Sequence, residues 1–275
     1  MPTIPDLTFH DGHSIPQLGF GLWQVSEDAQ AVVESALATG YRLIDGAYLY
    51  GNEKEMGAGL KASGVPREEV FLTTKVWNNE QGREKARRSV ERSLESIGVD
   101  QLDLVLIHWP DPEQDAYLET WEEFIRMRDE GLMRSIGTSN FNADHLDRII
   151  EATGEAPVLN QIELNPELQQ PRMRGENAKR NIITQAWTPL GNARSFEAEA
   201  ITSAAERTGK SPAQVILRWH VQSGHGVIPR STKPERQAAN MDVFDFELST
   251  PEMDAIAELD QGLRTGPDPS VFKIR

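Results

Sequence analysis

Four side chains that can hold or move a proton stand at or just beyond short apolar runs of the sequence: Asp45, Tyr50, Lys75 and His108. A nearby lysine stabilises a tyrosinate, so this set predicts a Tyr50 pKa below its usual value of about 10. Asp45 would keep Lys75 charged, since an unpaired buried ammonium loses its proton. Such a tyrosine can protonate the alkoxide formed when hydride reduces a carbonyl group. We therefore expect carbonyl reduction in which Tyr50 is the general acid and a neutral His108 forms a hydrogen bond with the substrate oxygen.

The elements that position these groups can be predicted from the apolar pattern. Segments of helical spacing alternate with eight short runs rich in apolar and β-branched residues, at 17–19, 41–45, 70–75, 102–108, 135–139, 158–161, 182–186 and 226–229. Strict alternation implies parallel strands, and eight units without a break in composition favour a closed barrel. We expect one α/β domain over residues 1–275, a single (β/α)8 TIM barrel. A hairpin at 7–15 with a two-residue turn at Asp11-Gly12 precedes it, and a tail at 262–275 follows.

Barrel enzymes carry their chemistry at the carboxyl ends of the strands. In this chain the expected strand ends also carry Ser139, Asn140, Gln161 and Trp187. Three tryptophans follow strands one, three and four, so we expect them to wall a substrate pocket with His108: Trp23, Trp77 and Trp109. Core packing is an equal alternative for Trp77.

The sequence resembles the aldo-keto reductase family from the hairpin to about Asp260. The segment 44–53 is similar to that family's tyrosine motif, and Lys75, His108-Trp109-Pro110 and 137–141 follow in the expected order. The pattern is most similar to the bacterial branch that includes the 2,5-diketogluconate reductases. The resemblance implies reduction of aldehydes and ketones, dicarbonyls and keto-sugars among them. It also implies a catalytic tetrad of Asp45, Tyr50, Lys75 and His108.

The same resemblance implies NADP(H) as cofactor, held on strand ends and the last loop. Ser139, Asn140 and Gln161 would bind the carboxamide of the nicotinamide, and Trp187 would stack on the nicotinamide ring. Residues 228–236 resemble the family's site for the adenosine 2′-phosphate, and a group with Arg230, Lys233 and Arg236 suits a phosphate dianion. The implied cofactor set is completed by Gly21, Leu22, Leu190, Ser231, Thr232 and Asn240. Gly46 and Ala239 depart from the family's usual threonine and frequent glutamate.

Composition excludes several other classes of function. The formal charge of −15 repels phosphate backbones and anionic membrane surfaces, so no nucleic-acid or membrane partner is expected. The 6 histidines are scattered and there are 0 cysteines, which predicts no metal site. No leader pattern opens the chain and no apolar run approaches the roughly 20 residues of a membrane helix. We expect a cytoplasmic enzyme acting on a small carbonyl compound, and the resemblance implies a monomer.

Two other functions remain open at this stage. A barrel glycosidase needs two facing carboxylates about 5 to 10 Å apart, whereas strands four and seven end in His108 and Trp187. A barrel that binds NADPH only as a sensor or structural protein is disfavoured by the complete tetrad. Gly57-x-Gly59-x-x-Ala62 matches the dinucleotide fingerprint as a string, but it lies inside a helical segment, which indicates close helix packing instead.

Overall fold

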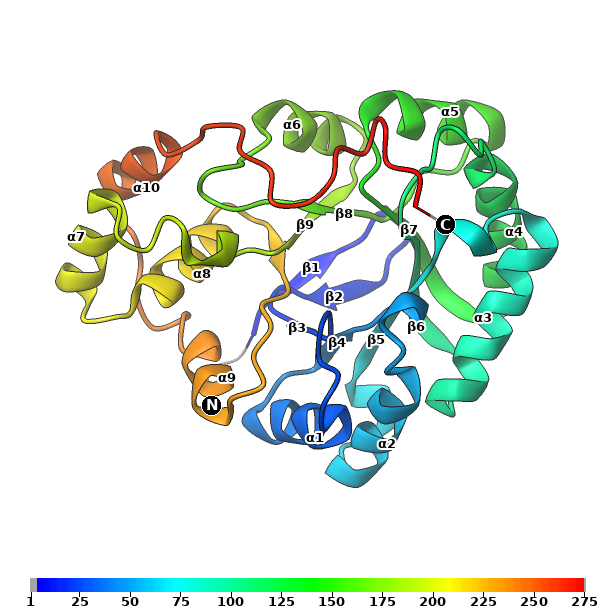
Figure 1. The fold of residues 1–275 in the computed structure, drawn as a ribbon, viewed down its shortest axis with the longest axis horizontal. Coiled ribbons are helices and arrows are strands. Elements are labelled where there is room, and N and C mark those ends of the chain that lie inside the picture. The colour runs from blue at the N-terminus through cyan, green and yellow to red at the C-terminus, as the bar shows by residue number, and fades with distance from the viewer. Residues whose placement is uncertain (1–3, 275) are drawn as a thin grey trace.

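The computed structural model describes residues 4–274 and contains a parallel sheet of eight strands (Figure 1). The strands pair in chain order: β3 (Phe20–Gly21), β4 (Leu43–Asp45), β5 (Phe71–Val76), β6 (Leu102–Ile107), β7 (Met133–Ser139), β8 (Leu159–Glu163), β9 (Ile183–Trp187) and β10 (Gly226–Val227). This order confirms the predicted parallel barrel. All eight carboxyl ends therefore point to one end of the sheet.

The sheet closes through the segment that precedes β3. Gly19 N–H donates to the Val227 carbonyl over 2.8 Å, and Val227 N–H donates to the Gln17 carbonyl over 2.8 Å. The first predicted strand, 17–19, was therefore placed too early. Its residues make these closing bonds and an isolated bridge at Leu18, while the regular strand that pairs with β4 starts at Phe20.

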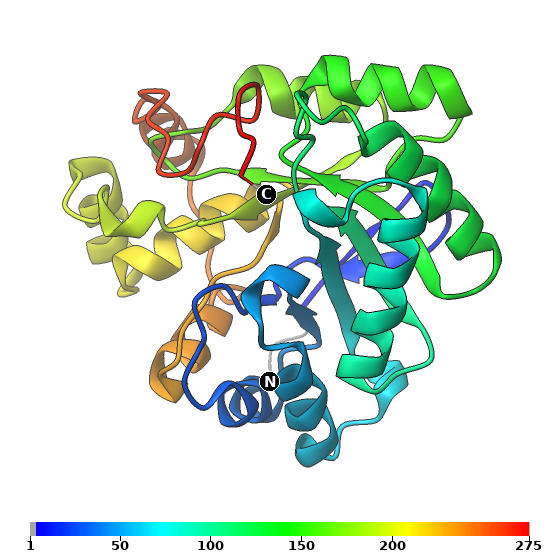
Figure 2. The ribbon, with the colours of Figure 1, turned by 45° about the vertical axis from the view of Figure 1, so that its right-hand side comes forward.

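Helices cover the outside of the barrel (Figure 2). They are α1 (Ala29–Thr39), α2 (Glu53–Ser63), α3 (Arg83–Ile97), α4 (Tyr117–Asp129), α5 (Ala143–Thr153), α6 (Pro171–Lys179), α7 (Glu199–Thr208), α8 (Pro212–Gln222), α9 (Pro234–Met241) and α10 (Thr250–Ala257). Short 3-10 turns are η1 (Tyr48–Tyr50), η2 (Arg67–Glu69), η3 (Asn78–Glu80) and η4 (Gly191–Ala193). Ser211 caps α8, where its side chain accepts a hydrogen bond from the Gln214 N–H, and α1 starts after Asp28.

The amino-terminal hairpin closes the far end of the barrel. Its strands are β1 (Asp6–Thr8) and β2 (Ser14–Pro16), and Asp11 accepts a hydrogen bond from the Ser135 hydroxyl at the start of β7 over 2.6 Å. The predicted two-residue turn is wrong. Phe9 N–H donates to the His13 carbonyl, so three residues form the loop and only Gly12, with φ 90°, has a positive φ within it.

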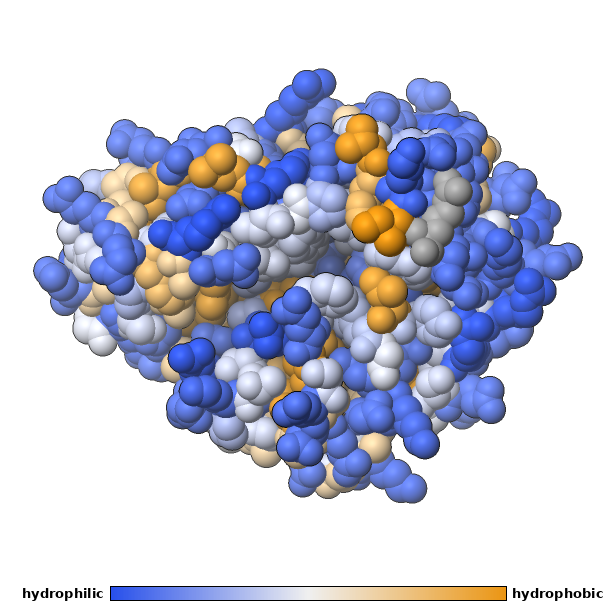
Figure 3. All heavy atoms as spheres, viewed as in Figure 1, coloured by the Kyte–Doolittle hydropathy of each residue, from blue (hydrophilic) through white to orange (hydrophobic). Residues whose placement is uncertain are grey.

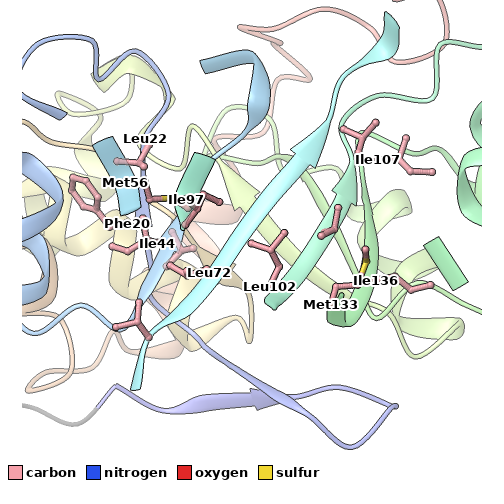
Figure 4. Close-up of a cluster of buried hydrophobic side chains, with 14 of the residues drawn as sticks. Phe20, Leu22, Ile44, Met56, Leu72, Ile97, Leu102, Ile107, Met133 and Ile136 are labelled. Atoms are coloured by element: carbon pink, nitrogen blue, oxygen red, sulfur yellow. The ribbon is translucent and has the colours of Figure 1, made fainter. Parts of the chain in front are cut away.

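The apolar core of the described residues has three parts: one between barrel and helices, one inside the barrel, and one where α7, α8 and α10 pack together. Figure 4 shows the first part, where side chains from the strands meet the helices; Phe20, Ile44, Leu72 and Met56 are among those drawn. Inside the barrel, Leu43, Leu104 and Leu159 pack with hairpin residues such as Ile15. Burial of each side chain of this size contributes about 1.5–3 kcal/mol to the stability of the fold, and this packing holds the strand ends in fixed positions.

The glycine string in α2 allows helices to pack closely. A Cβ at Gly57 would lie 1.9 Å from the Ile97 carbonyl oxygen, and one at Gly59 would lie 2.7 Å from the Gln30 carbonyl oxygen. No side chain fits at either position. This confirms that the string belongs to helix packing and not to a dinucleotide fold.

A buried pair of histidines makes the fold sensitive to acid. The rings of His220 and His225 lie 5.7 Å apart, and Arg174 approaches His225 at 3.3 Å. Burial lowers the pKa of His220 to about 3, while burial, His220 and Arg174 lower the pKa of His225 to about 2. Both imidazoles are therefore neutral in the folded protein at neutral pH.

We predict that the protein loses stability as the pH falls below about 6.5. The unfolded chain takes up protons near that pH, whereas folded His220 and His225 take them up only near pH 3 and 2, so acid favours unfolding. At pH 5 the loss is roughly 2 kcal/mol for each histidine. Urea unfolding at pH 7 and pH 5 measures it. A variant with both histidines replaced by glutamine should show a clearly smaller difference, and an equal difference would contradict this assignment.

Candidate active site

The predicted tetrad residues lie together at the carboxyl end of the barrel. Asp45 ends β4, Lys75 lies near the end of β5, and His108 directly follows β6. Tyr50 belongs to η1, the turn after β4. Figure 3 shows this face of the molecule, which is hollowed near its centre, with apolar residues beside the hollow and a mainly hydrophilic outer surface.

Asp45 and Lys75 form a buried ion pair. Lys75 Nζ donates to Asp45 Oδ1 over 2.5 Å and to the Gly46 carbonyl over 2.8 Å. The second carboxylate oxygen, Asp45 Oδ2, accepts a hydrogen bond from Gln161 over 2.7 Å. Burial lowers the pKa of Lys75, and the Asp45 carboxylate opposes that shift. A charged lysine at this depth therefore depends on Asp45.

Tyr50 lies over this pair, with Lys75 Nζ 5.3 Å from the centre of its ring. Burial, with a further contribution from the Asp45 charge, raises the pKa of Tyr50 well above its ordinary value. This direction is opposite to the expected one, because the expectation considered the Lys75 charge and left out burial of the phenol, which is the largest cause of the shift. Tyr50 consequently holds its proton at neutral pH, which is the state a proton donor needs.

His108 is neutral in this site. Burial and the nearby Lys75 charge lower the pKa of His108 well below its usual value. Its ring lies 5.8 Å from that of Tyr50 and 4.9 Å from that of Trp77, centre to centre. The imidazole can therefore serve as a neutral hydrogen-bonding group beside the tyrosine.

The residues expected to hold the nicotinamide are brought together at the ends of β7, β8 and β9. The Ser139 hydroxyl donates to the Gln161 carbonyl over 2.9 Å, and Asn140 Nδ2 donates to the His108 carbonyl over 3.0 Å. Trp187 is half-buried, and its indole N–H donates to Asn140 Oδ1 over 2.8 Å. These bonds join the three strand ends into one polar rim.

Three further predicted cofactor residues flank this rim. Gly21 N–H donates to the Pro229 carbonyl over 3.1 Å, and Leu22 N–H donates to the Asp45 carbonyl over 2.9 Å. A Cβ at Gly21 would lie 3.1 Å from the Ile228 carbonyl oxygen, so this position has little room for a side chain. Leu190 is half-buried just before η4.

The predicted phosphate-binding residues lie beyond β10 and on α9. Arg230, Thr232 and Arg236 are exposed, whereas Ser231 and Asn240 are buried. Among residues 4–274, no carboxylate forms a salt bridge with Arg230, Lys233 or Arg236. In a chain of net charge −15, unpaired cations of this kind leave room for an anionic ligand.

Aromatic side chains border the tetrad. The Trp23 ring lies 5.0 Å from that of Tyr50 and the side chain is 49% exposed. Trp77 and Trp109 are buried, and both contact Phe272 of the carboxyl-terminal tail, with Trp109 at 4.3 Å between ring centres. All three predicted tryptophans are thus adjacent to the site or to its cover.

The tail over residues 262–274 passes across this end of the barrel (Figures 1 and 2), while Arg275 lies outside the described residues. Glu163, at the end of β8, anchors it. This fully buried carboxylate accepts hydrogen bonds from the Thr265 N–H and hydroxyl, both 2.5 Å, and from Gly266 N–H at 3.2 Å. We did not predict Glu163 from the sequence, although its position two residues beyond Gln161 places it on the same face of the strand.

Comparisons with known proteins show the family to which the chain belongs. The family model described as "Aldo/keto reductase family" matches residues 17–261. An aldo-keto reductase of Mycolicibacterium smegmatis is 50% identical over 98% of both chains, and methylglyoxal reductase DkgA of Escherichia coli is 46% identical over 98% of both. The crystal structure of a Gox0644 variant in complex with NADPH has a TM-score of 0.95 and 44% identity, covering 99% of this chain and 100% of that one. The chain belongs to the aldo/keto reductase family, as its sequence motifs predicted.

No helix between residues 4 and 274 is both long and apolar enough to cross a membrane. In that same part of the chain, no group of three or more histidine, aspartate or glutamate side chains is arranged to hold a metal ion.

We predict that Glu163→Gln releases the tail. An amide has only one acceptor oxygen, and its NH₂ group would face the backbone donors of Thr265 and Gly266. Losing about one charge-assisted bond should raise the rate of trypsin cleavage after Arg264 on the order of tenfold. Glu258→Gln, which changes an exposed carboxylate after α10, is the matched control. Identical cleavage rates in the two variants would show that Glu163 does not hold the tail.

Proposed function

We propose that this chain reduces aldehydes and ketones to alcohols with NADPH, and that Tyr50 is the general acid. The observation that carries the proposal is the buried Asp45–Lys75 pair, with Lys75 Nζ 5.3 Å from the centre of the Tyr50 ring and neutral His108 beside it. A protonated tyrosine above a lysine is suited to protonating an alkoxide as it forms.

The residues of the chain fit NADP(H). Arg230 and Arg236 are exposed and form no salt bridge with any residue from 4 to 274, so with Ser231 they suit a 2′-phosphate. Ser139, Asn140 and Gln161 lie at the strand ends where a carboxamide would bind. Trp187 and Leu190 would pack on the cofactor, with Gly21, Leu22, Thr232 and Asn240 completing its site. When bound, NADPH supplies a hydride to the carbonyl carbon.

The tetrad performs the proton transfer. As the carbonyl oxygen gains charge, it takes the proton of the Tyr50 hydroxyl, and the O–H bond of Tyr50 breaks. Lys75 then stabilises the tyrosinate through its charge, while Asp45 keeps Lys75 oriented. His108 donates or accepts a hydrogen bond without carrying charge, which fixes the angle of the substrate oxygen.

The substrate class we propose is small carbonyl compounds, with dicarbonyls and keto-sugars included. Trp23, Trp77 and Trp109 would border the substrate. The relatives named methylglyoxal reductase support a dicarbonyl substrate. We also propose that the enzyme is cytoplasmic and monomeric, since one chain supplies every tetrad residue; sedimentation of the purified protein tests the monomer.

Tyr50→Phe should abolish turnover, because it removes only the proton donor. General acids contribute roughly 100-fold to 10,000-fold, so the rate of NADPH oxidation with methylglyoxal should fall by that factor while cofactor affinity stays nearly unchanged. Tyr48→Phe, the same change two residues away in η1, is the control and should keep its activity. Wild-type rates in Tyr50→Phe would remove Tyr50 from the mechanism.

Arg236→Ala should weaken NADPH binding and leave NADH binding almost unchanged. The variant loses one charge-assisted contact to the 2′-phosphate, worth roughly 1.5 to 3 kcal/mol, and NADH has no phosphate there. Fluorescence titration of both cofactors measures the two affinities, which should converge. Arg88→Ala, at an exposed arginine of α3, should change neither. Equal losses for both cofactors in Arg236→Ala would mean that this residue supports the fold or the adenine instead.

A further inference from the structure

Two buried glutamines connect the ion pair to the neighbouring strand. Gln161 of β8 and Gln185 of β9 are paired directly in the sheet register. Gln161 Nε2 donates to Asp45 Oδ2 over 2.7 Å and to Gln185 Oε1 over 2.7 Å. All three side chains belong to residues that are at most 2% exposed. The two amides therefore form a hydrogen-bonded row that ends on the carboxylate of the tetrad.

The chemistry of the groups fixes the direction of this row. An ionised carboxylate only accepts hydrogen bonds, so Gln161 must turn its NH₂ group towards Asp45. Both N–H bonds of Gln161 are then used, one by Asp45 and one by Gln185. The oxygen Oε1 is the only amide atom of Gln161 left to meet a cofactor carboxamide. A flipped Gln161 would place its oxygen against the carboxylate and is excluded by repulsion.

The side chain of Gln185 has one favourable and one unfavourable hydrogen-bonding group in this position. Its own Nε2 is buried and has no hydrogen-bond partner in the described part of the chain. Its neighbour in β10 is Gly226, where a Cβ would lie 3.2 Å from Gln185 Cγ and 3.5 Å from Nε2. An unpaired buried amide N–H₂ is unfavourable by itself, so the favourable part of this arrangement is the bond that Gln185 Oε1 accepts.

We propose that Gln185 is a positioning residue of the reaction: its Oε1 holds the Gln161 amide so that Nε2 faces Asp45 and Oε1 faces the nicotinamide carboxamide. This inference rests on the proposed function. In this proposal, Gln185 of β9 does not contact the substrate. It influences the nicotinamide end of the cofactor and the Asp45–Lys75 pair only through its hydrogen bond to Gln161.

Gln185→Met tests the proposal, since it keeps the length of the side chain and removes the acceptor. One Gln161 N–H then has no partner, and the amide is free to turn. The affinity for NADP⁺ and the single-turnover rate of hydride transfer to methylglyoxal should each fall roughly threefold to tenfold. The affinity for adenosine 2′,5′-bisphosphate, which lacks the nicotinamide, should stay within about twofold.

Gln17→Met is the matched control. Gln17 is also a buried glutamine that makes two hydrogen bonds, to the carbonyls of Val221 and His225, but these do not involve the tetrad. This variant should lower the melting temperature and leave all three of those measurements within about twofold of wild type. Its behaviour separates lost stability from lost positioning.

Gly226→Ala is a second variant in case Gln185→Met does not fold. It adds a methyl group against Gln185 and should weaken NADP⁺ binding more than binding of the bisphosphate. The positioning role would be overturned by either of two results in whichever of these variants folds. One is an equal loss of affinity for NADP⁺ and for the bisphosphate, and the other is unchanged NADP⁺ affinity together with unchanged hydride transfer. A wild-type protein that oxidises no NADPH with any carbonyl compound would instead overturn the proposed function, so the two failures are distinguishable.

Discussion

The site depends on one interaction, the buried contact between Asp45 and Lys75. Taking a carboxylate and an ammonium out of water costs several kcal/mol for each ion, and their attraction offsets this only when the geometry is good and the remaining donors and acceptors are satisfied. Here the Lys75 ammonium also reaches the Gly46 carbonyl and Asp45 also accepts from Gln161. The partners come from β4, β5 and β8, so the closed, tightly packed barrel is what keeps the pair within bonding distance.

Burial and the charges of that pair together set the protonation of the other two predicted tetrad members. Burial and the Lys75 charge keep His108 from accepting a proton, whereas burial and the Asp45 charge keep Tyr50 from losing one. Both aromatic groups are therefore neutral, and the proposed donor already carries its proton. In the proposed mechanism, a lower tyrosine pKa is required only while negative charge moves from the substrate oxygen onto Tyr50, and Lys75 is already in place for that step.

Local pattern in the sequence predicted the strands, their order and the polar residues at their ends, because alternation and strand-end position are properties of short segments. It did not predict Glu163 or Gln185, whose roles depend on partners brought close by the fold. Glu163 bonds Thr265, far along the chain, and Gln185 gains its partner only through the β8–β9 register. The wrong direction for the Tyr50 pKa has the same origin, since burial of the phenol, the largest cause of the shift, is evident only in the folded chain. The hairpin turn failed for a local reason: Asp11-Gly12 is compatible with both two-residue and three-residue loops.

The charged groups near the two ends of the proposed cofactor site differ in their exposure to solvent and salt. The tetrad pair is buried and almost unaffected by salt, whereas Arg230 and Arg236 are exposed within a strongly acidic protein. At about 0.1 M salt the screening length is near 10 Å, so an approaching anion is influenced mainly by the charges closest to it. The net charge of −15 would repel a phosphate in dilute buffer, yet near physiological salt the local cations determine its attraction. In the proposed function, the exposed arginines are therefore suited to binding the phosphate end, while the buried groups would act once the nicotinamide end has entered the barrel.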